Sequence, residues 1–562
     1  MSATQPLPVL ITGAGPSGLV LALSLVQHGI QVRIIDRDQQ FHIGQRGAGI
    51  QPRTLEAYNL LDVLPDIVSR GMDLLPLRFY KLPGGVEPSK TFNLFPLEEP
   101  TPSTPYINIR VLGQAKAEQV LREHLATYGC HVERGTELCS FEQNVDHAVA
   151  HLVKRDGAEE IAETVICRWL VGTDGAKGIV RKHLGLTFLG EALAGQIVFG
   201  EIVVKNLTRD YWHCWGEFGS KTVILRPTED DEIYNFIVSG DIDLQKIYED
   251  YDTLVQTLKD ISDRQDLIFG EIKFKSNYSP NVRMVNKFSE GRVFVAGDAA
   301  HVHSPTGGQG MNSSVQDALN LGWKLALVEL GFASQSLLST YTEERLPVIS
   351  HMLKETTTLL HATINEKADG GDISQGWTRP RDLKMLGVNY RWSSIVHDER
   401  HPQQTSGEEK QLVDAYGTNM SDGLHAGDRA PDAPGLAVVE TGNVGSETTS
   451  LFRIFSSTHH TILILSSDSD QMTAVLELAK KLPSRFVRTV VILPRDSAPL
   501  PVASGANIVC IDQDGHGYTG YSAGTERATV AVVRPDGVVG ALVVGATGLG
   551  AYFKNMFSNV KA

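Results

Sequence analysis

The chain has 562 residues, a formal net charge of −15, an apolar fraction of 42% and a charged fraction of 21%. This length exceeds what one hydrophobic core usually serves, so two or three domains are expected. The composition argues against a disordered chain. The negative charge disfavours nucleic acid or an anionic membrane as a partner, because either would repel the average field of the protein.

Cysteine content and hydropathy narrow the expected location. The five cysteines are an odd number, include no CxxC pair and lack zinc-site spacing, so we expect free thiols and no metal site. The apolar stretch 19–26 follows no basic segment and is too short to span a bilayer. A cytoplasmic protein without a membrane span is therefore expected.

The first fifty residues contain a dinucleotide-binding pattern. A strand over 7–12 precedes a turn with Gly13, Gly15 and Gly18, a helix to Gly29, and a strand over 31–35 that ends at Asp36. These glycines permit a tight turn, close backbone approach to a pyrophosphate and close helix packing, and the acid can bind a ribose. The three glycines, Asp36 and the adjacent Arg37 are predicted cofactor contacts. The pattern alone does not distinguish NAD from FAD.

Further elements follow in chain order. Apolar spacing predicts helices over 114–129, 313–330 and 345–362, and strands over 169–171 and 292–296. Between 196 and 238, apolar and aromatic residues tend to alternate with polar ones, which indicates half-buried antiparallel strands.

The last part of the sequence indicates a separate small α/β domain. Residues 401–428 are polar and are interpreted as a linker. Strand-like runs follow at 451–455, 461–465, 487–493 and 508–511, and a hairpin is expected to turn at 535–537.

Two segments after the glycine turn resemble motifs of the class A flavoprotein monooxygenases. These are the second motif at 167–181, with Thr173-Asp174-Gly175, and the third motif at 292–301, with Gly297-Asp298-Ala299. The resemblance continues through 305–312 into Asp317, Asn320, Trp323 and Lys324. It implies that Asp298 binds the ribityl chain of FAD and that Asp174 lies near flavin and nicotinamide.

The resemblance implies further cofactor contacts. Glycines in the third segment would let backbone approach the flavin, and the following helix would direct N–H groups at it. The implied residues are Arg46, Gln114, Pro305, Gly308, Gly310, Met311 and Asn312. Because no second GxGxxG and no CxxxxC disulfide motif occur, NADPH or NADH is expected to dock transiently as the electron donor.

The end of the chain resembles the thioredoxin-like domain of the phenol hydroxylase branch, through 426–432 and 533–537. The expected fold is therefore a Rossmann-like FAD-binding domain of the glutathione-reductase type, an antiparallel substrate-binding sheet and a thioredoxin-like domain. The expected ranges are 1–80, 105–190 and 286–400 for FAD binding, 81–104 and 191–285 for substrate, 401–428 for a linker, and 429–562 for the thioredoxin-like domain. With Cys510 as its one cysteine, the tail is expected to serve packing or a homodimer contact, and residues after 421 are expected to be dispensable for flavin chemistry.

The sequence departs from the branch at two positions. Ala48 stands where the branch has an aspartate that acts on the substrate hydroxyl, and Gly178 stands where serine is usual. The resemblance therefore assigns no catalytic base to this chain. The catalytic candidates from the alternating strands are His213, Arg226 and Tyr234. Each could instead be a core polar residue with its hydrogen bonds satisfied.

The expected function is single-component aromatic hydroxylation. The resemblance implies that NAD(P)H reduces FAD and that O2 forms a flavin C4a-hydroperoxide, which oxygenates a phenolic small molecule, with or without loss of a carboxylate. A Baeyer–Villiger or epoxidising monooxygenase, a flavin reductase or dehydrogenase, and a non-catalytic FAD-binding protein are the alternatives. The absence of a carboxylate at Ala48 favours an already ionised or a bulky substrate.

Overall fold

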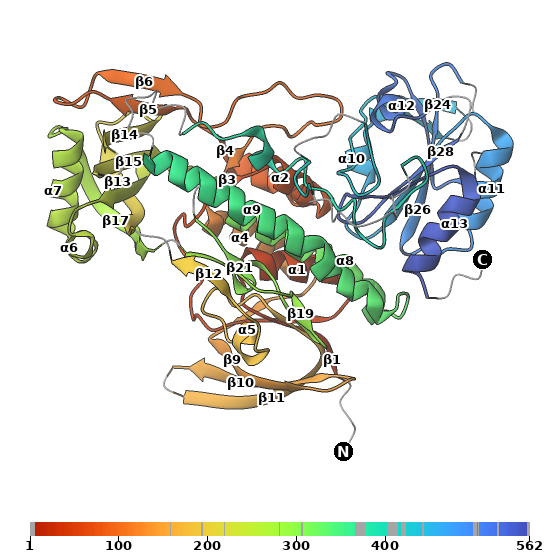
Figure 1. The fold of residues 1–562 in the computed structure, drawn as a ribbon, viewed down its shortest axis with the longest axis horizontal. Helices are drawn as coiled ribbons and strands as arrows, with labels where there is room; N and C mark the ends of the chain where they lie inside the picture. The colour runs from red at the N-terminus through yellow and green to blue at the C-terminus, as the bar shows by residue number, and fades with distance from the viewer. Residues whose placement is uncertain are drawn as a thin grey trace, which may run out of the picture.

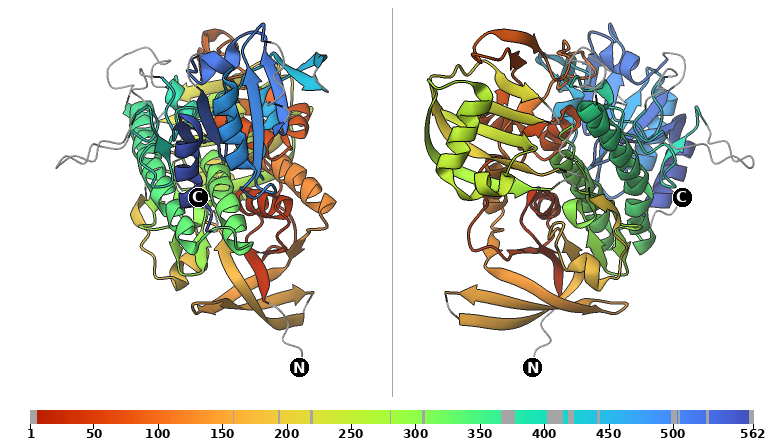
Figure 2. Two further views of the ribbon diagram at one scale, coloured as in Figure 1. Left: turned by 90° about the vertical axis from the view of Figure 1, so that its right-hand side faces the viewer. Right: turned by 60° about the vertical axis from the view of Figure 1, so that its left-hand side comes forward.

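The computed structural model describes residues 6–157, 159–192, 195–217, 220–279, 281–304, 307–365, 377–401, 414–417, 423–440, 443–497, 503, 505–524 and 528–558. A central α/β region carries a β-sheet domain on one side and a C-terminal α/β region on the other (Figure 1). The right-hand view of Figure 2 again shows these two outer regions on opposite sides. Among the described residues, no helix combines the length and apolar character needed to cross a membrane.

The central sheet is built on five strands in the parallel order β20-β11-β1-β2-β8. Their bounds are Val293–Val295, Glu159–Gly172, Leu7–Thr12, Val32–Asp36 and Val132–Arg134. Residues Val9, Leu10 and Ile11 of β1 are fully buried, as expected for a strand covered on both faces. The chain leaves β1 for β2 in one direction and later returns to β11 on the other side, so the carboxyl end of β1 is a topological switch point, where open α/β sheets bind ligands.

Helices and short strands complete the central region. The helices are α1 (Pro16–Gln27), α2 (Pro52–Leu60), α3 (Leu64–Arg70), α4 (Gln114–Thr127), α5 (Val180–His183), α8 (Gly310–Glu329) and α9 (Ser339–Asn365). The strands are β3 (Gly49–Ile50), β4 (Met72–Asp73), β7 (Arg110–Val111), β9 (Thr136–Gln143), β10 (Ala148–Asp156), β12 (Leu189–Ala192), β18 (Asn281–Met284), β19 (Ser289–Glu290) and β21 (His301–Val302). Short 3-10 helices cover Gly297–Ala299, Gln335–Leu338 and Arg381–Lys384.

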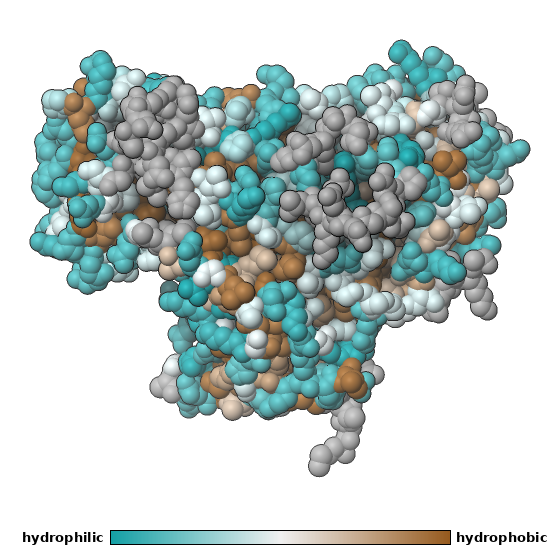
Figure 3. Space-filling view, in the orientation of Figure 1, coloured by the Kyte–Doolittle hydropathy of each residue, from teal (hydrophilic) through white to brown (hydrophobic). Residues whose placement is uncertain are grey.

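The side domain is a seven-stranded sheet in the order β17-β13-β16-β15-β14-β5-β6. The bounds are Ile268–Tyr278, Ile197–Lys205, Ile233–Gly240, Lys221–Pro227, Trp212–Glu217, Leu77–Tyr80 and Pro88–Phe92. Helices α6 (Leu244–Glu249) and α7 (Tyr251–Ser262) cover one face. Burial alternates along β13, as predicted, whereas β15 is buried from Thr222 to Pro227. Hydrophilic residues dominate the outer rim of this side of the molecule (Figure 3).

The C-terminal sheet has the order β22-β29-β28-β25-β26-β27-β23-β24. The bounds are His397–Asp398, Val539–Val543, Thr529–Val533, His460–Leu465, Val487–Leu493, Ile508–Asp512, Leu436–Glu440 and Asn443–Thr449. Its helices are α10 (Leu451–Ile454), α11 (Ser469–Ala479), α12 (His516–Gly520) and α13 (Gly545–Met556). Because β22 pairs with β29, this sheet includes residues that precede the predicted linker.

One predicted strand in the C-terminal region is wrong. Residues 451–454 form the helical turn α10 instead of extended backbone. The Asp432 carboxylate accepts the Phe452 backbone N–H at 2.8 Å, which satisfies one of the donors that a helix start leaves open. A short apolar run does not distinguish a buried strand from a helical turn, and the deciding carboxylate lies about twenty residues away in sequence.

Candidate active site

The glycine turn after β1 is shaped for a phosphate group. A side-chain carbon at Gly18 would lie 2.1 Å from the Gly13 carbonyl oxygen, and one at Gly13, where φ is +101°, would lie 2.3 Å from the Thr173 carbonyl oxygen. A side-chain carbon at Gly15 would meet nothing within 4 Å. Gly13 and Gly18 therefore fix the turn, whereas Gly15 borders open space at the N-terminus of α1, where a pyrophosphate fits.

Asp36 holds this turn from the end of β2. Its carboxylate accepts the backbone N–H of Ala14 at 2.8 Å and that of Asp38 at 2.9 Å. The side chain is half-buried, and a carboxylate has further lone pairs for ribose hydroxyls. Arg37 is exposed and lies 3.8 Å from Asp38, so it can reach a cofactor only from the surface.

Asp298 lies beside the glycine turn. Its side chain is open to solvent, yet the surrounding protein raises the pKa of its carboxyl above the ordinary value by desolvation. We infer from these two properties that Asp298 borders a cleft. The neighbouring Gly297, at φ +60°, lies so close to Ser17 that a side-chain carbon would be 2.1 Å from its hydroxyl oxygen. Close packing on α1 thus brings Asp298 to the turn.

Asp174 connects the second motif to α5. Its Oδ2 accepts the backbone N–H groups of Ile179 at 2.7 Å and Val180 at 3.1 Å. Its Oδ1 is buried and has no hydrogen-bond partner among the residues that the structure describes, and burial raises the pKa of the carboxyl. A side-chain carbon at Gly178 would lie 2.1 Å from this carboxylate, which explains why the usual serine is absent here.

Asn312 is one of the buried side chains that hold the loop before α8. Asn312 is fully buried; its Oδ1 accepts the Gln51 N–H at 2.8 Å, and its Nδ2 donates to the carbonyls of Gly49 at 2.9 Å and Gly308 at 2.7 Å. Gly308 is exposed at φ +63°, and Gly310 and Met311 are partly buried. Asn312 therefore fixes the loop, and Gly308, Gly310 and Met311 are left to face a cofactor. Pro305 lies outside the described residues.

A buried polar chain supports this loop from below. His301 Nε2 lies 2.6 Å from Asp317 Oδ2, and Asp317 Oδ1 accepts from Arg345 Nε at 2.7 Å. All three side chains are fully buried. Arg345 holds the pKa of Asp317 below its ordinary value against the opposing effect of burial. These contacts give His301 a structural role beneath the Asp298 segment.

Arg46 and Gln114 lie together at the start of α4. The Gln114 backbone N–H donates to the Gly47 carbonyl at 2.8 Å, and its Nε2 donates to Glu118 at 2.8 Å. Arg46 is exposed, and its charge acts to lower the pKa of Glu118, which burial raises. The structure thus brings these two predicted contacts to one place.

The substrate sheet separates the three catalytic candidates. His213 and Tyr234 face α6 and α7, with Tyr234 in the core between sheet and helices. His213 Nδ1 lies 2.6 Å from the Tyr80 hydroxyl and Nε2 lies 2.8 Å from the Thr208 carbonyl, and burial lowers its pKa to about 4. The Tyr234 hydroxyl donates to the Leu207 carbonyl at 2.7 Å. Both are core polar residues with satisfied hydrogen bonds, so the structure does not bring them to the face of Arg226.

Arg226 points to the opposite face, toward the central region. Its Nη2 donates to Gln45 Oε1 at 2.5 Å, and burial lowers its pKa to about 10. In the strand register, Arg226 is opposite Asn235, which is opposite Glu201. These three side chains therefore form a row on one face. Sequence reasoning missed Gln45, Glu201 and Asn235; the alternation along 196–238 was the available signal, but it does not tell which face meets the cofactor.

A buried ionic network joins the C-terminal region to α8 and α9. Arg534 donates to both carboxylate oxygens of Glu344, at 2.7 and 2.9 Å, and Lys324 donates to Glu344 at 2.7 Å. All three side chains are fully buried. Removal of the tail would leave Lys324 and Glu344 without this partner, so we expect it to lower stability. That the tail is dispensable for flavin chemistry stays a prediction.

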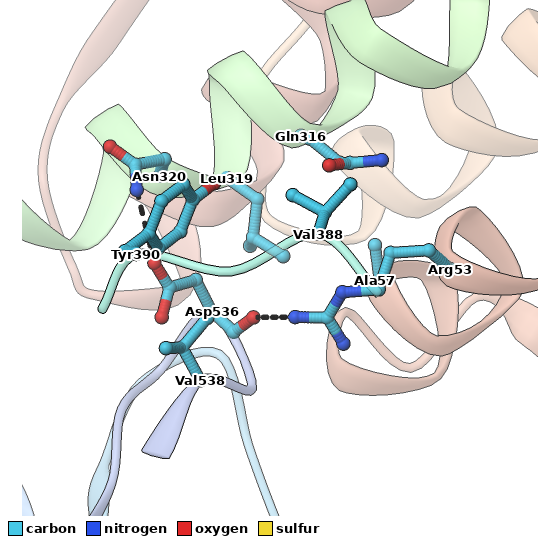
Figure 4. Close-up of a pocket in the computed structure, with 9 residues that line it drawn as sticks. All are labelled: Arg53, Ala57, Gln316, Leu319, Asn320, Val388, Tyr390, Asp536 and Val538. Atoms are coloured by element: carbon cyan, nitrogen blue, oxygen red, sulfur yellow. Dashed lines mark hydrogen bonds between the residues drawn. The ribbon is translucent and has the colours of Figure 1, made fainter. Parts of the chain in front are cut away.

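A small cavity lies next to this network, between α2, α8 and the hairpin turn at 536–538 (Figure 4). It measures about 20 Å³ and is lined by Arg53, Asn320, Tyr390 and Asp536 among others. This volume holds one or two water molecules and no aromatic substrate. The cavity belongs to the interface between regions and lies apart from the glycine turn.

Comparison with known proteins agrees with this geometry. The FAD binding domain family matches residues 6–356. A flavin-dependent monooxygenase of Mycobacteroides abscessus is 34% identical over 81% of this chain and 88% of its own length. Pentachlorophenol 4-monooxygenase of Sphingobium chlorophenolicum is 30% identical over 76% of this chain and 75% of its own length.

Solved structures share the fold over the whole chain. The flavin-dependent monooxygenase PieE, in complex with FAD and substrate, has a TM-score of 0.79 at 19% identity and covers 98% of this chain and 99% of its own. Aklavinone-11 hydroxylase, in a ternary complex with FAD and aklavinone, has a TM-score of 0.78 at 23% identity and covers 100% of both chains. The chain is an enzyme that binds FAD and belongs to the FAD-dependent aromatic monooxygenases.

Proposed function

We propose that this enzyme uses NADPH or NADH and O2 to hydroxylate an aromatic small molecule. The inferred cleft at the switch point of the central sheet carries the proposal, because it combines open space over Gly15, the solvent-reached carboxylate of Asp298 and the N-terminus of α8. Arg226 of the substrate sheet donates a hydrogen bond to Gln45, which directly precedes Arg46. Such a cleft can orient a ring beside a flavin and keep water away, which suppresses unproductive decay.

The residues of this chain would hold the cofactor along its length. The backbone at Gly13, Gly15 and Gly18 would bind the pyrophosphate, Asp36 the adenosine ribose, and Asp298 the ribityl chain. FAD supplies the redox and oxygen chemistry when bound. The loop at Gly308, Gly310 and Met311 would direct N–H groups of α8 at the ring and stabilise negative charge there. Arg37, Arg46, Gln114, Asp174 and Pro305 remain proposed contacts.

The electron donor is proposed to dock transiently, because no second GxGxxG follows a strand in the sequence. For the C-terminal region we propose a thioredoxin-like fold. The units β25-α11-β26 and β28-β29-α13 around a mixed sheet support it. Cys510 is its one cysteine, so a dithiol reaction is excluded. Its role would be to stabilise α8 and α9, and a homodimer contact stays a prediction.

The substrate is proposed to be a neutral, bulky phenol or polycyclic aromatic rather than a carboxylate. The carboxylates of Glu229 and Glu201 already offset the positive charge of Arg226. We therefore expect Arg226 to attract an anionic substrate only weakly. Asn235 Nδ2 is buried and has no hydrogen-bond partner among the described residues, and it can donate to a carbonyl or hydroxyl oxygen. Among the relatives, a monooxygenase of Streptomyces rimosus is named for 6-methylpretetramide. Ala48 is buried and carries no carboxylate, so a bulky ring is compatible with this position.

A substrate panel tests the proposal. NADPH and NADH oxidation by the FAD-loaded protein is measured with simple phenols, hydroxybenzoates and polycyclic phenols. Stimulation by neutral phenols or polycyclic compounds, together with a hydroxylated product, is expected. Stimulation by hydroxybenzoates alone would contradict the substrate class. Lactone or epoxide products would favour the alternative oxygenations, and oxidation that no aromatic compound stimulates would favour a reductase.

A further inference from the structure

Gln45 joins the flavin-contacting segment to the substrate sheet. It precedes Arg46 and is 4% exposed. Its backbone N–H donates to Glu201 Oε1 at 2.8 Å, its Oε1 accepts from Arg226 at 2.5 Å, and its Nε2 donates to Glu229 Oε2. Gln45 thus engages three charged side chains, two through its own side chain and one through its backbone N–H, and hydrogen bonds to charged groups are stronger than neutral ones.

The same contacts reach the start of α4. Glu229 Oε1 accepts the backbone N–H of Gly113 at 3.1 Å, directly before Gln114. Arg46 and Gln114 therefore lie on two backbone segments that Gln45 and Glu229 tie to the middle of β13 and the end of β15. If Gln45 moved, its buried amide would need new hydrogen-bond partners, because an unpaired polar group is costly in a buried site.

We propose that Gln45 is a positioning residue, which holds the Arg46 and Gln114 segments in register with the row of Glu201, Asn235 and Arg226. This inference rests on the proposed function. A substrate that contacts the row acts on Arg226 or Glu201, and Gln45 carries that contact to the backbone that borders the flavin. The expected signature is acceleration of flavin reduction by substrate, which a side chain with only a packing role would not affect.

An exchange of partners tests the role of the Gln45 and Glu229 pair. Gln45→Glu keeps the acceptor for Arg226 but places the new carboxylate beside that of Glu229. In the double variant with Glu229→Gln, the new amide can donate to position 45 while its oxygen still accepts from Gly113. The negative charge has then moved from position 229 to position 45, and each of these hydrogen bonds has a donor and an acceptor again. Gln40→Glu, at an exposed position, is the matched control for the added charge.

The measurement is anaerobic flavin reduction by NADPH, with and without an aromatic compound that stimulates the wild type. Gln45→Glu should lower the stimulation by about tenfold or more, as expected when a charge-assisted hydrogen bond is lost. The double variant should recover it to within about threefold, and Gln40→Glu should match the wild type. Wild-type stimulation in Gln45→Glu, or no recovery in the double variant, would overturn the inference.

The experiment also distinguishes failure of the proposed function from a variant that does not fold. If no aromatic compound stimulates the wild type, the proposed function fails before Gln45 is tested. If Gln45→Glu does not fold with FAD, Gln45→Leu, which removes the contacts without adding a charge, replaces it. Stimulation lost in Gln45→Leu while bound FAD and KM for NADPH stay near wild type supports a positioning role, and full stimulation contradicts it.

Discussion

The flavin cleft and the substrate sheet are specified by different kinds of contact. At the cleft, backbone conformation and the lack of side chains decide the shape, as Gly13, Gly18 and Gly297 show. On the sheet, neighbouring residues of one strand face opposite ways, and long-range partners such as Gln45 decide what each side chain can do. We therefore expect the flavin cleft to tolerate few substitutions. On the substrate sheet, we expect single side chains to determine which substrate is accepted.

The largest expected effect separates two glycines of one turn. Gly18→Ala places a carbon 2.1 Å from the Gly13 carbonyl oxygen, whereas Gly15→Ala meets nothing within 4 Å. Gly18→Ala should therefore prevent folding or lower the melting temperature sharply, with or without FAD. Gly15→Ala should fold normally and lose at least about tenfold in FAD affinity, because the cofactor must approach this backbone closely. Thermal unfolding and FAD titration of both variants check this, and equal behaviour of the two would contradict the roles assigned to them.

The second prediction concerns the buried ion network that joins the C-terminal region to α8 and α9. Arg534→Met leaves Glu344 and Asp536 buried with Lys324 as the remaining cation. Breaking a buried ion network in this way costs about 3–5 kcal/mol. Urea unfolding should show this loss, and Lys480→Met, at an exposed pair, should change stability little. A protein that lacks the region after 421 and is as stable as the full chain would contradict this stabilising role.

Asp298 should affect cofactor binding more than folding. The carboxylate borders the inferred cleft and is reached by solvent, so Asp298→Asn removes no core contact. Loss of a charged acceptor for a ribityl hydroxyl should weaken FAD binding by about 1.5–3 kcal/mol. Flavin fluorescence titration provides the measurement, with thermal unfolding of the FAD-free protein as the control. Unchanged affinity would remove Asp298 from the set of cofactor contacts.

The smallest expected effect distinguishes the two faces of the sheet. Arg226→Lys keeps the charge but loses the planar donor to Gln45, so kcat/KM should fall by about tenfold while stability changes little. His213→Gln should leave kcat/KM per folded enzyme unchanged. It should instead change how the free energy of unfolding falls as the pH is lowered. Reversed results would mean that the faces have been assigned the wrong way round.

The pH dependence follows from the sign of the His213 shift. Burial lowers its pKa to about 4 in the folded state, compared with about 6.5 in the unfolded chain. As the pH falls below 6.5, the unfolded chain takes up a proton and the folded protein does not. The stability that neutral His213 contributes, up to about 3 kcal/mol, is therefore lost progressively toward pH 4. His213→Gln should flatten this decline in unfolding measurements between pH 7 and 4.

The same contrast explains how much the sequence could predict. Glycine spacing and the end of a strand are local features, so the turn after β1 and Asp36 could be inferred from neighbouring residues, whereas Asp298 was predicted from the resemblance of its segment to a family motif. The separation of His213 from Arg226 depends on which face of the sheet α6 and α7 cover, and that is settled by tertiary packing. Gln45 stood inside a recognised segment, but its partners at 201, 226 and 229 lie more than 150 residues away.

The Arg534 network escaped prediction for a similar reason. The turn at 535–537 was identified as a hairpin from its residue types, and β28 and β29 confirm it. Turn chemistry does not reveal that the preceding arginine enters the core of another region. Burial of four charged groups at one interface requires the coordinates of α8, α9 and the tail together.

Oxygen transfer tests the central claim most directly. The enzyme is incubated with NADPH, a stimulating aromatic compound and ¹⁸O2, and the product is analysed by mass spectrometry. We expect one ¹⁸O atom in each hydroxylated product molecule and none when ¹⁸O is supplied as water. Oxidation of NADPH with an unchanged aromatic compound and peroxide as the sole oxygen product would contradict an aromatic monooxygenase.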